Sequence, residues 1–228
     1  MKSSSSLIAV VAVILVLGTA LYFQVRNSNA PSLNTPAPTA GENAGALEDG
    51  TYAIDAGASR VEWSGRKTLI ANYVDTGTLN VKEGSIEVKN GTVTGTVVMD
   101  MTSITTLTTG SGKGMDMQAN HMKSDDFFAV ETHPTSTFVI KESIPAEDVA
   151  TSHLYTIKGE LTIKNITQPV EFQAAIYMQD GALHTNAATT LDRTLWDIRY
   201  ASSKFYGDLA DKVIDDMFGV AYDVTARK

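Results

Sequence analysis

From Thr51 to Lys228 the chain alternates apolar and polar side chains in short stretches, most of which end at a Gly, Asn or Pro turn. Between Leu154 and Lys164, for example, Tyr, Ile, Gly, Leu and Ile occupy every second position and polar residues fill most of the others. Side chains of a strand point to opposite faces with a period of two, so each stretch predicts a strand with one buried face. Many such strands at short intervals predict an antiparallel sheet that closes on itself or packs against a second sheet.

The alternation predicts about eight to ten strands. In chain order they are Thr51–Asp55, Arg60–Gly65, Gly77–Val81, Ser85–Lys89, Thr92–Met101, a strand carrying Phe138 and Ile140, Leu154–Lys164, Pro169–Met178, Leu183–Leu191 and Phe218–Ala226. Asn90-Gly91 is the strongest hairpin signal, because a type I′ turn needs positive φ at both central positions. Small residues such as Gly159 and Ala174 fall on inward positions, where they leave room for a channel.

The longest interval without alternation separates the strand that ends at Met101 from the one that carries Phe138. Its first part, Thr102–Gly114, is rich in Thr and Gly and is predicted to be a connection. Its second part, Met115–Val130, is predicted to form one or two short helices that cover one end of the barrel. Short helical turns are also expected within Ser202–Asp215.

The N-terminal 50 residues have a different composition from the rest of the chain. Residues 1–26 contain a run of 17 uncharged residues, Leu7 to Phe23, which predicts an N-terminal hydrophobic helix that anchors the protein in a membrane. A cleaved signal peptide is the alternative, and both interpretations export the domain. Residues 27–50 are rich in Pro, Ala, Ser and Asn and predict a disordered, flexible linker. Residues 51–228 remain as one barrel domain.

Charge and composition exclude several functions. The formal net charge is −8 and no basic stripe is visible, so nucleic acid is not an expected partner. Thr109–Gly114 lacks the spacing of a Walker loop, and the chain has neither a cysteine nor a Gly-x-Ser-x-Gly motif. The four histidines are not spaced as metal ligands. We therefore expect no catalytic residue, no metal and no cofactor.

Three segments carry a family resemblance. They are His121–Phe138 (HMKSDDFFAVETHPTSTF), Gly159–Phe172 (GELTIKNITQPVEF) and Asp192–Tyr200 (DRTLWDIRY), followed by an Asp-rich segment and the last strand. In this order the segments resemble the signature of the YceI-like family, over nearly all of residues 51–226. Family members often place a His in the early Asp-x-x-x-Ser segment and another before the first long turn. Here Ala58 and Asp75 stand near those places.

The resemblance implies an all-β fold, an antiparallel lipocalin-like barrel of about eight strands, in an exported, periplasmic protein. It also implies a polyisoprenoid or similar amphiphilic lipid bound inside the barrel. Aromatic residues that fall on inward faces or on the covering segments are the candidates for the cavity wall. They are Trp63, Phe127, Phe128, Phe138, Phe172, Trp196, Tyr200 and Phe218.

An anionic head group at the barrel mouth needs a charge-assisted partner, for which His121, Arg193 and Arg199 are the candidates. A barrel of eight strands can hold one small ligand or be filled by its own side chains. Two alternatives therefore stay open: an enzyme or accessory protein that acts on an isoprenoid quinone, and a filled barrel that serves as an interaction module. The sequence also leaves the oligomeric state open, a homodimer included.

Overall fold

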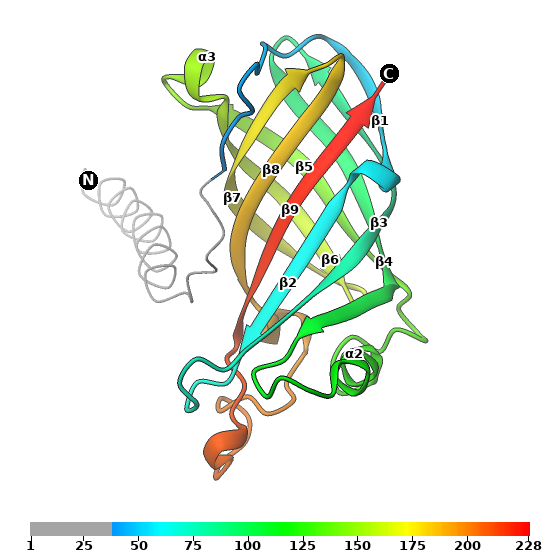
Figure 1. Cartoon of the computed structure of the whole chain (residues 1–228). Coiled ribbons are helices and arrows are strands. Elements are labelled where there is room, and N and C mark those ends of the chain that lie inside the picture. The colour runs from blue at the N-terminus through cyan, green and yellow to red at the C-terminus, as the bar shows by residue number, and fades with distance from the viewer. Residues whose placement is uncertain (1–37) are drawn as a thin grey trace, which may run out of the picture. The chain divides into compact units, whose positions relative to one another are not determined.

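Within residues 38–228, which the computed structural model of the chain describes, nine strands form one antiparallel sheet (Figure 1). The strands are β1 (Gly50–Ile54), β2 (Arg60–Arg66), β3 (Val74–Lys89), β4 (Thr92–Thr108), β5 (Thr135–Pro145), β6 (Leu154–Ile163), β7 (Ile166–Gln179), β8 (Ala182–Asp192) and β9 (Met217–Arg227). The helical elements are η1 (Ala56–Ala58), α2 (Met115–Lys123), α3 (Val149–Ser152), η2 (Arg193–Trp196) and η3 (Ala210–Lys212).

The sheet closes into a barrel because β4, the last strand in the order, pairs with β3 near the other end. The order of strands around the wall is β1-β3-β2-β9-β8-β7-β6-β5-β4, and β3 also pairs with β4. β1 and β2 share one place between β3 and β9: Ile54 of β1 pairs with Ala226, and Trp63 of β2 pairs with Val220 of the same strand β9. The wall therefore has eight places, and the predicted antiparallel barrel of about eight strands is confirmed.

Tight turns join three pairs of neighbouring strands, and the predicted turn at Asn90-Gly91 is one of them. Three hairpins have positive φ at both turn residues: Asn90-Gly91 (52° and 75°), Lys164-Asn165 (50° and 59°) and Asp180-Gly181 (51° and 74°). This is the geometry of a type I′ turn, whose twist matches that of the flanking strands. The turns fix the register, and the register decides which side chains point into the barrel.

The predicted break between two strands at 77–81 and 85–89 is absent. The sequence predicts separate strands at 77–81 and 85–89, but β3 continues through Glu83 and Gly84 with irregular register against β4. A Cβ at position 84 would lie 2.4 Å from the carbonyl oxygen of Thr96, so Gly84 serves the close approach of two strands and no turn. The apparent break is a set of β-bulges inside one strand.

β4 is longer than predicted, because it includes the first part of the expected connection. Thr102 to Thr108 extend the strand, and Thr106 and Thr108 pair with the start of β3. Threonine is β-branched and favours strands. In this segment, however, threonines fall on both faces of the strand, so apolar and polar residues do not alternate and the sequence does not indicate a strand. Beyond this strand, α2 ends at Lys123, so the predicted helical region at 115–130 contains one helix followed by turns.

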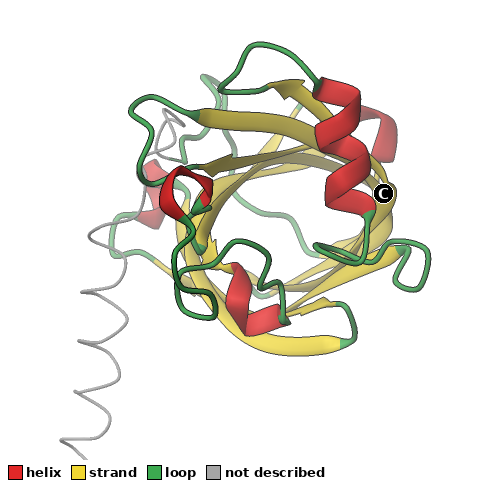
Figure 2. Ribbon diagram, turned by 90° about the horizontal axis from the view of Figure 1, so that it is seen from below, coloured by secondary structure: helices red, strands yellow, loops and turns green. Residues whose placement is uncertain are grey.

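One end of the barrel is filled by side chains. Tyr52, Leu183 and Ala226 are fully buried there, together with Tyr155 and Met178, and Leu47 packs against them. We call this the closed end. The opposite end carries α2, η2, η3 and the loops around them (Figure 2).

Residues 38–49 contact the barrel before β1 begins. Gly45 exchanges two backbone hydrogen bonds with Met178 at the end of β7, of 2.7 and 3.1 Å. Thr39 exchanges two with the side chain of Asn186 on β8. The predicted anchor and residues 27–37 of the predicted linker lie outside the described residues. Among residues 38–228 there is no helix of sufficient length and hydropathy to cross a membrane.

Candidate ligand cavity

A cavity of about 410 Å³ lies inside the barrel. Inward side chains of β2 to β9 form its wall, together with side chains of α2 and of the segment after α2. On β9, for example, Phe218, Val220, Tyr222 and Val224 occupy alternate positions and all line the cavity. A concave, mainly apolar wall of this volume with a few polar groups is the usual form of a small-molecule site.

Most of the aromatic residues predicted for the wall are found in it. Trp63, Phe138, Phe172 and Phe218 point inward from strands, as their place in the alternation predicts. Phe127, Phe128 and Tyr200 reach the cavity from the loops at the end opposite the closed end. The rings of Phe138 and Phe172 lie 5.6 Å apart and form part of one continuous apolar surface.

Trp196 is the exception, because it does not line the cavity. Its side chain is fully buried in a cluster with Leu161 and Ile198. Its indole N–H donates a 3.0 Å hydrogen bond to the carbonyl oxygen of Leu161. Trp196 therefore fastens η2 to the wall instead of forming its inner surface.

Two small inward residues do not provide the expected space. At Gly159 a Cβ would lie 2.5 Å from the ring of Phe138 and 2.5 Å from the carbonyl oxygen of Val139, so a neighbouring side chain already fills this position. Ala174 is fully buried in the closed end and is not part of the cavity wall. Both residues point inward, but neither is adjacent to open space.

The cavity stops at the closed end and opens at the other. Tyr52, Tyr155 and Leu183 do not line it, whereas the solvent-exposed Lys212 does. We call the opening beside Lys67, Tyr73, Asp75 and Lys212 the mouth. A long molecule can therefore enter from one direction only.

Polar groups gather at the mouth. The ammonium group of Lys67 lies 4.9 Å from the centre of the Tyr73 ring, and Arg66 pairs with Asp215 at 2.7 Å. Burial raises the pKa of the Asp75 carboxyl above its usual value, although a hydrogen bond from the Gly110 N–H and the charge of Lys67 oppose the rise. The mouth thus presents cations beside a carboxyl group that burial makes harder to ionise.

His121 lies in the last turn of α2, and its ring contacts the loop that carries Tyr200. Its Nε2 is 3.0 Å from Oδ2 of Asp126, and its ring meets those of Phe127 and Tyr200 edge to face, at 5.0 and 4.7 Å. Because His121 also lines the cavity, it is the one predicted head-group residue that is both at the wall and half-exposed.

Residues 52–226 match the YceI-like domain. The chain belongs to the YceI-like family.

Two solved structures share the fold of this YceI-like domain. BcnA of Burkholderia cenocepacia is 16% identical, with a TM-score of 0.58 over 76% of this chain and 99% of BcnA. A polyisoprenoid binding domain from Saccharophagus degradans, implicated in plant cell wall breakdown, is 14% identical, with a TM-score of 0.55 over 77% of this chain and 97% of that domain. A comparison with curated proteins gives no match.

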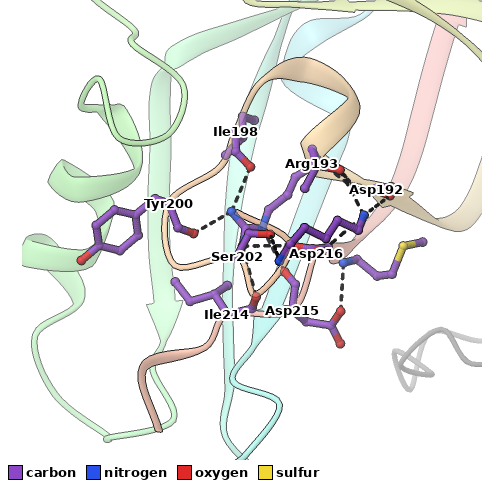
Figure 3. A network of polar contacts seen from close by, with 11 residues as sticks. Asp192, Arg193, Ile198, Tyr200, Ser202, Ile214, Asp215 and Asp216 are labelled. Atoms are coloured by element: carbon purple, nitrogen blue, oxygen red, sulfur yellow. Dashed lines mark hydrogen bonds and ion pairs between the residues drawn. The ribbon is translucent and has the colours of Figure 1, made fainter. Parts of the chain in front are cut away.

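Arg193 has a structural role in the YceI-like domain, because its guanidinium group holds the loop after η2 in place (Figure 3). Its guanidinium group donates to the backbone carbonyl oxygens of Ile198, Tyr200, Ile214 and Asp215 at 2.8–3.1 Å, and it lies 3.5 Å from Oδ1 of Asp216. These five contacts use the five N–H donors of an arginine. Although Arg193 lines the cavity, no donor is left for a ligand.

The neighbouring carboxylate of Asp192 is held in the same network. Burial acts to raise the pKa of Asp192, but hydrogen bonds from Lys204 and Thr194 outweigh burial and hold the pKa below its usual value. Lys204 also lies 3.3 Å from Oδ2 of Asp216. The adjacent acids Asp215 and Asp216 thus hold Arg66, Arg193 and Lys204 in place, and no paired carboxylate site results.

Arg199 is not part of the cavity wall. It pairs with Asp197, and its guanidinium group stacks over the ring of Phe205 at 4.8 Å. More than half of its side chain is exposed on the outside of the loop. A head-group contact by Arg199 has no support in this arrangement.

The early Asp-x-x-x-Ser segment has a structural role here. Asp55 caps η1 by accepting a hydrogen bond from the N–H of Ala58, and Ser59 donates its hydroxyl hydrogen to the carbonyl oxygen of Asp55 at 2.7 Å. Ala58 does not line the cavity, whereas Asp75 lies at the mouth. Of the two positions where relatives often have a histidine, one therefore belongs to the candidate site.

Three polar residues of the cavity, Lys67, Lys212 and Tyr222, are not among the residues predicted from the sequence. Tyr222 lies on a correctly predicted inward face, and its hydroxyl group is 3.5 Å from that of Thr185. Burial raises the pKa of Tyr222 to about 12. Lys67 follows the end of β2 and Lys212 ends the short helix η3, and no periodic pattern marks either residue. Among residues 38–228, no group of three or more His, Asp or Glu side chains is arranged to hold a metal ion.

Proposed function

We propose that this protein is an exported binding protein that holds a long-chain amphiphile, a polyisoprenoid or a related lipid, inside its barrel. The observation that carries the proposal is the cavity, which is apolar, closed at one end and open at a mouth with polar groups. An apolar chain that enters the cavity leaves water, and its polar head stays at the mouth.

The head group is proposed to contact Lys67, Lys212 and His121. All three line the mouth side of the cavity, whereas the donors of Arg193 are already used and Arg199 lies outside. Lysine and histidine can bind phosphate or carboxylate groups through charge-assisted hydrogen bonds. An anionic head is therefore preferred over a neutral one in this proposal.

The relatives support the class of ligand. One structural neighbour is described as a polyisoprenoid binding domain, and the two chains share the fold at 14% identity. Such a distant relative does not identify the lipid. It makes an isoprenoid the first compound to test.

Binding without catalysis is part of the proposal. The cavity argues against the alternative of a filled barrel that serves only as an interaction module. The other alternative, chemistry on an isoprenoid quinone, has no observation that favours it. We also propose that the domain works outside the cytoplasm, with residues 7–23 as its membrane anchor.

The test is a series of isoprenoid phosphates of increasing chain length. Each methylene that the cavity buries contributes about 0.8 kcal/mol, so affinity should rise about fourfold per methylene until the cavity is full, then level off. Isothermal titration calorimetry in a mild detergent measures this rise. Affinity that does not depend on chain length would contradict the proposed function.

A further inference from the structure

Exposed large hydrophobic side chains are concentrated at the mouth end of the barrel. Of the ten such residues in the described part of the chain, nine lie on segments at this end, and only Ile144 lies elsewhere. The six most exposed are Met117, Leu69, Leu107, Tyr206, Leu195 and Phe205. Single exposed apolar residues are normal, but nine at one end of a barrel are not a scattered distribution.

The segments that carry these residues lie together at the mouth end of the barrel (Figure 2). Leu69 belongs to the β2–β3 loop, whose neighbouring residues Lys67 and Tyr73 line the cavity. Met117 lies on α2, which contributes Gln118 to the wall. Phe205 and Tyr206 lie on the loop between η2 and η3, which contributes Tyr200. The apolar side chains and the mouth thus share one surface.

The charge of this surface also differs from that of the rest of the domain. The segments at the mouth end, residues 66–75, 107–134, 163–166 and 193–217, contain nine basic and ten acidic residues. The remainder of residues 51–228 contains seven basic and thirteen acidic residues. The excess negative charge is therefore away from the mouth, so the mouth end is the part of the barrel that an anionic surface repels least.

We propose that the mouth end docks on the surface of a lipid bilayer, with the mouth against the membrane, so that the amphiphile passes between bilayer and cavity without crossing water. The proposal rests on the proposed function. Every methylene that has to cross water reduces the crossing population about fourfold, so direct contact removes the main barrier to loading.

A membrane is the partner that fits this surface. The exposed aromatic residues Tyr200, Phe205 and Tyr206 all lie at the mouth end. The amphipathic ring of tyrosine favours the head-group region of a bilayer, and Phe, Leu and Met side chains favour the layer beneath it. Near-neutral charge with interspersed lysines suits a surface of mixed zwitterionic and anionic lipids.

The length of the N-terminal chain permits this orientation. If residues 7–23 lie in the bilayer, residues 24–37 can span up to about 46 Å when fully extended. Thr39 is bonded to Asn186, which is six residues from the mouth end of β8 at Asp192, or about 20 Å along the strand. The tether is therefore long enough for the mouth to reach the membrane that holds the anchor.

The absence of cysteine makes the test direct. In the full chain, Met117→Cys places a single thiol at the mouth end, and Ile144→Cys places one at the other end as the matched control. Each variant is labelled with an environment-sensitive fluorophore and reconstituted into vesicles of phosphatidylcholine and phosphatidylglycerol. We expect lipids with a quencher in the upper acyl chain to quench the probe at 117 at least about fivefold more than the probe at 144, because only the first enters the interface.

A second variant separates docking from ligand binding. The double substitution Leu69→Asp and Met117→Asp, read out by a probe at Leu107→Cys, should lower the docked fraction about tenfold or more. Isoprenoid binding in detergent should stay unchanged, because neither side chain lines the cavity. Equal quenching of the probes at 117 and 144 overturns the docking proposal. The same result is expected if a soluble protein, and not a membrane, covers this surface. Lost isoprenoid binding in the parent chain overturns the proposed function itself.

Discussion

Thr189 and Thr190 are neighbours on β8 that face opposite sides of the barrel wall. Thr189 lines the cavity and pairs with Val220 on β9, whereas Thr190 points outward by the alternation of the strand. The two positions have the same side chain and the same strand environment. They therefore form a matched pair for testing whether the space inside the barrel holds the ligand.

We expect Thr189→Trp to abolish binding of a long-chain isoprenoid with little loss of stability, because the indole ring enters space that is empty in the parent. Thr190→Trp should bind as the parent does. In a filled core the larger ring would overpack and cost about 1–3 kcal/mol, or about 2–4 °C in Tm for each kcal/mol. Titration and thermal unfolding measure both effects. If Thr189→Trp lost several degrees in Tm, or bound as tightly as Thr190→Trp, the cavity would not be the binding site.

The direction of a side chain in this barrel follows from the sequence, but its surroundings do not. Alternation places Trp63, Phe138 and Phe172 on the inner face, where they are found. It places Gly159 there as well, yet the ring of Phe138 occupies the adjacent space. Whether an inward position is empty depends on cross-strand neighbours and on distance from the closed end. A single strand carries no information about either.

The loop from η2 to the start of β9 is organised by one side chain. Arg193 donates to the carbonyl oxygens of Ile198, Tyr200, Ile214 and Asp215, which lie at both ends of this loop. The loop in turn carries Tyr200 and Lys212 to the mouth. The shape of the mouth therefore depends on the planar arrangement of donors that arginine has and lysine lacks.

We expect Arg193→Lys to destabilise this loop by about 1–3 kcal/mol, because lysine cannot satisfy the buried carbonyl oxygens that it leaves behind. Hydrogen exchange at residues 197–214 should accelerate, and exchange in β6 and β7 should change little. Arg199→Lys is the control, since that side chain is largely exposed. The same exchange rates in both variants would argue against an organising role for Arg193.

Turn chemistry defines elements in this chain better than composition does. Asn-Gly and Asp-Gly pairs correctly mark two hairpins, because few other residues accept positive φ at both positions. By contrast, Gly84 suggests a turn and lies inside β3, and the Thr-rich end of β4 suggests a connection and is a strand. Glycine in a bulge and threonine on both faces of a strand have no sequence signature that separates them from loops. Whether such a segment forms a strand depends on its pairing with the neighbouring strand.

The whole barrel has two unlike ends. The closed end is packed with Tyr52, Tyr155 and Leu183, and the other end carries the mouth, the exposed apolar residues and most of the helical segments. The alternation predicts a barrel with one covered end, but it carries no information on whether the opposite end is open or packed shut. The answer depends on Leu47 and other residues that are distant in sequence and meet only in the folded chain.

At this scale the predicted anchor is open to direct test. We expect the full chain to stay in the membrane fraction of cells through an alkaline wash, with its N-terminal residues intact. Leu15→Arg places a charge in the middle of the apolar run, at a cost of about 2.5–3.5 kcal/mol for insertion, and should shift protein out of that fraction. N-terminal sequencing completes the measurement. A soluble species that starts near Ala30 or Asn43 would show that the segment is a cleaved signal.

The pairing of Gly45 with Met178 has a mechanical consequence. The chain that leads toward the N-terminus leaves the barrel past this pair, so a pulling force on the N-terminus is transmitted first to the bonds at Thr39 and then to those at Gly45. The hydrogen bonds at Thr39 and Gly45 bear the force one after the other, so each can break separately. Each strand of the wall, by contrast, is bonded along its length to neighbours on both sides. Tension would therefore peel residues 39–49 away and withdraw Leu47 before it strained the wall. Tension on the N-terminus would therefore change the packing of the closed end before it changed the mouth.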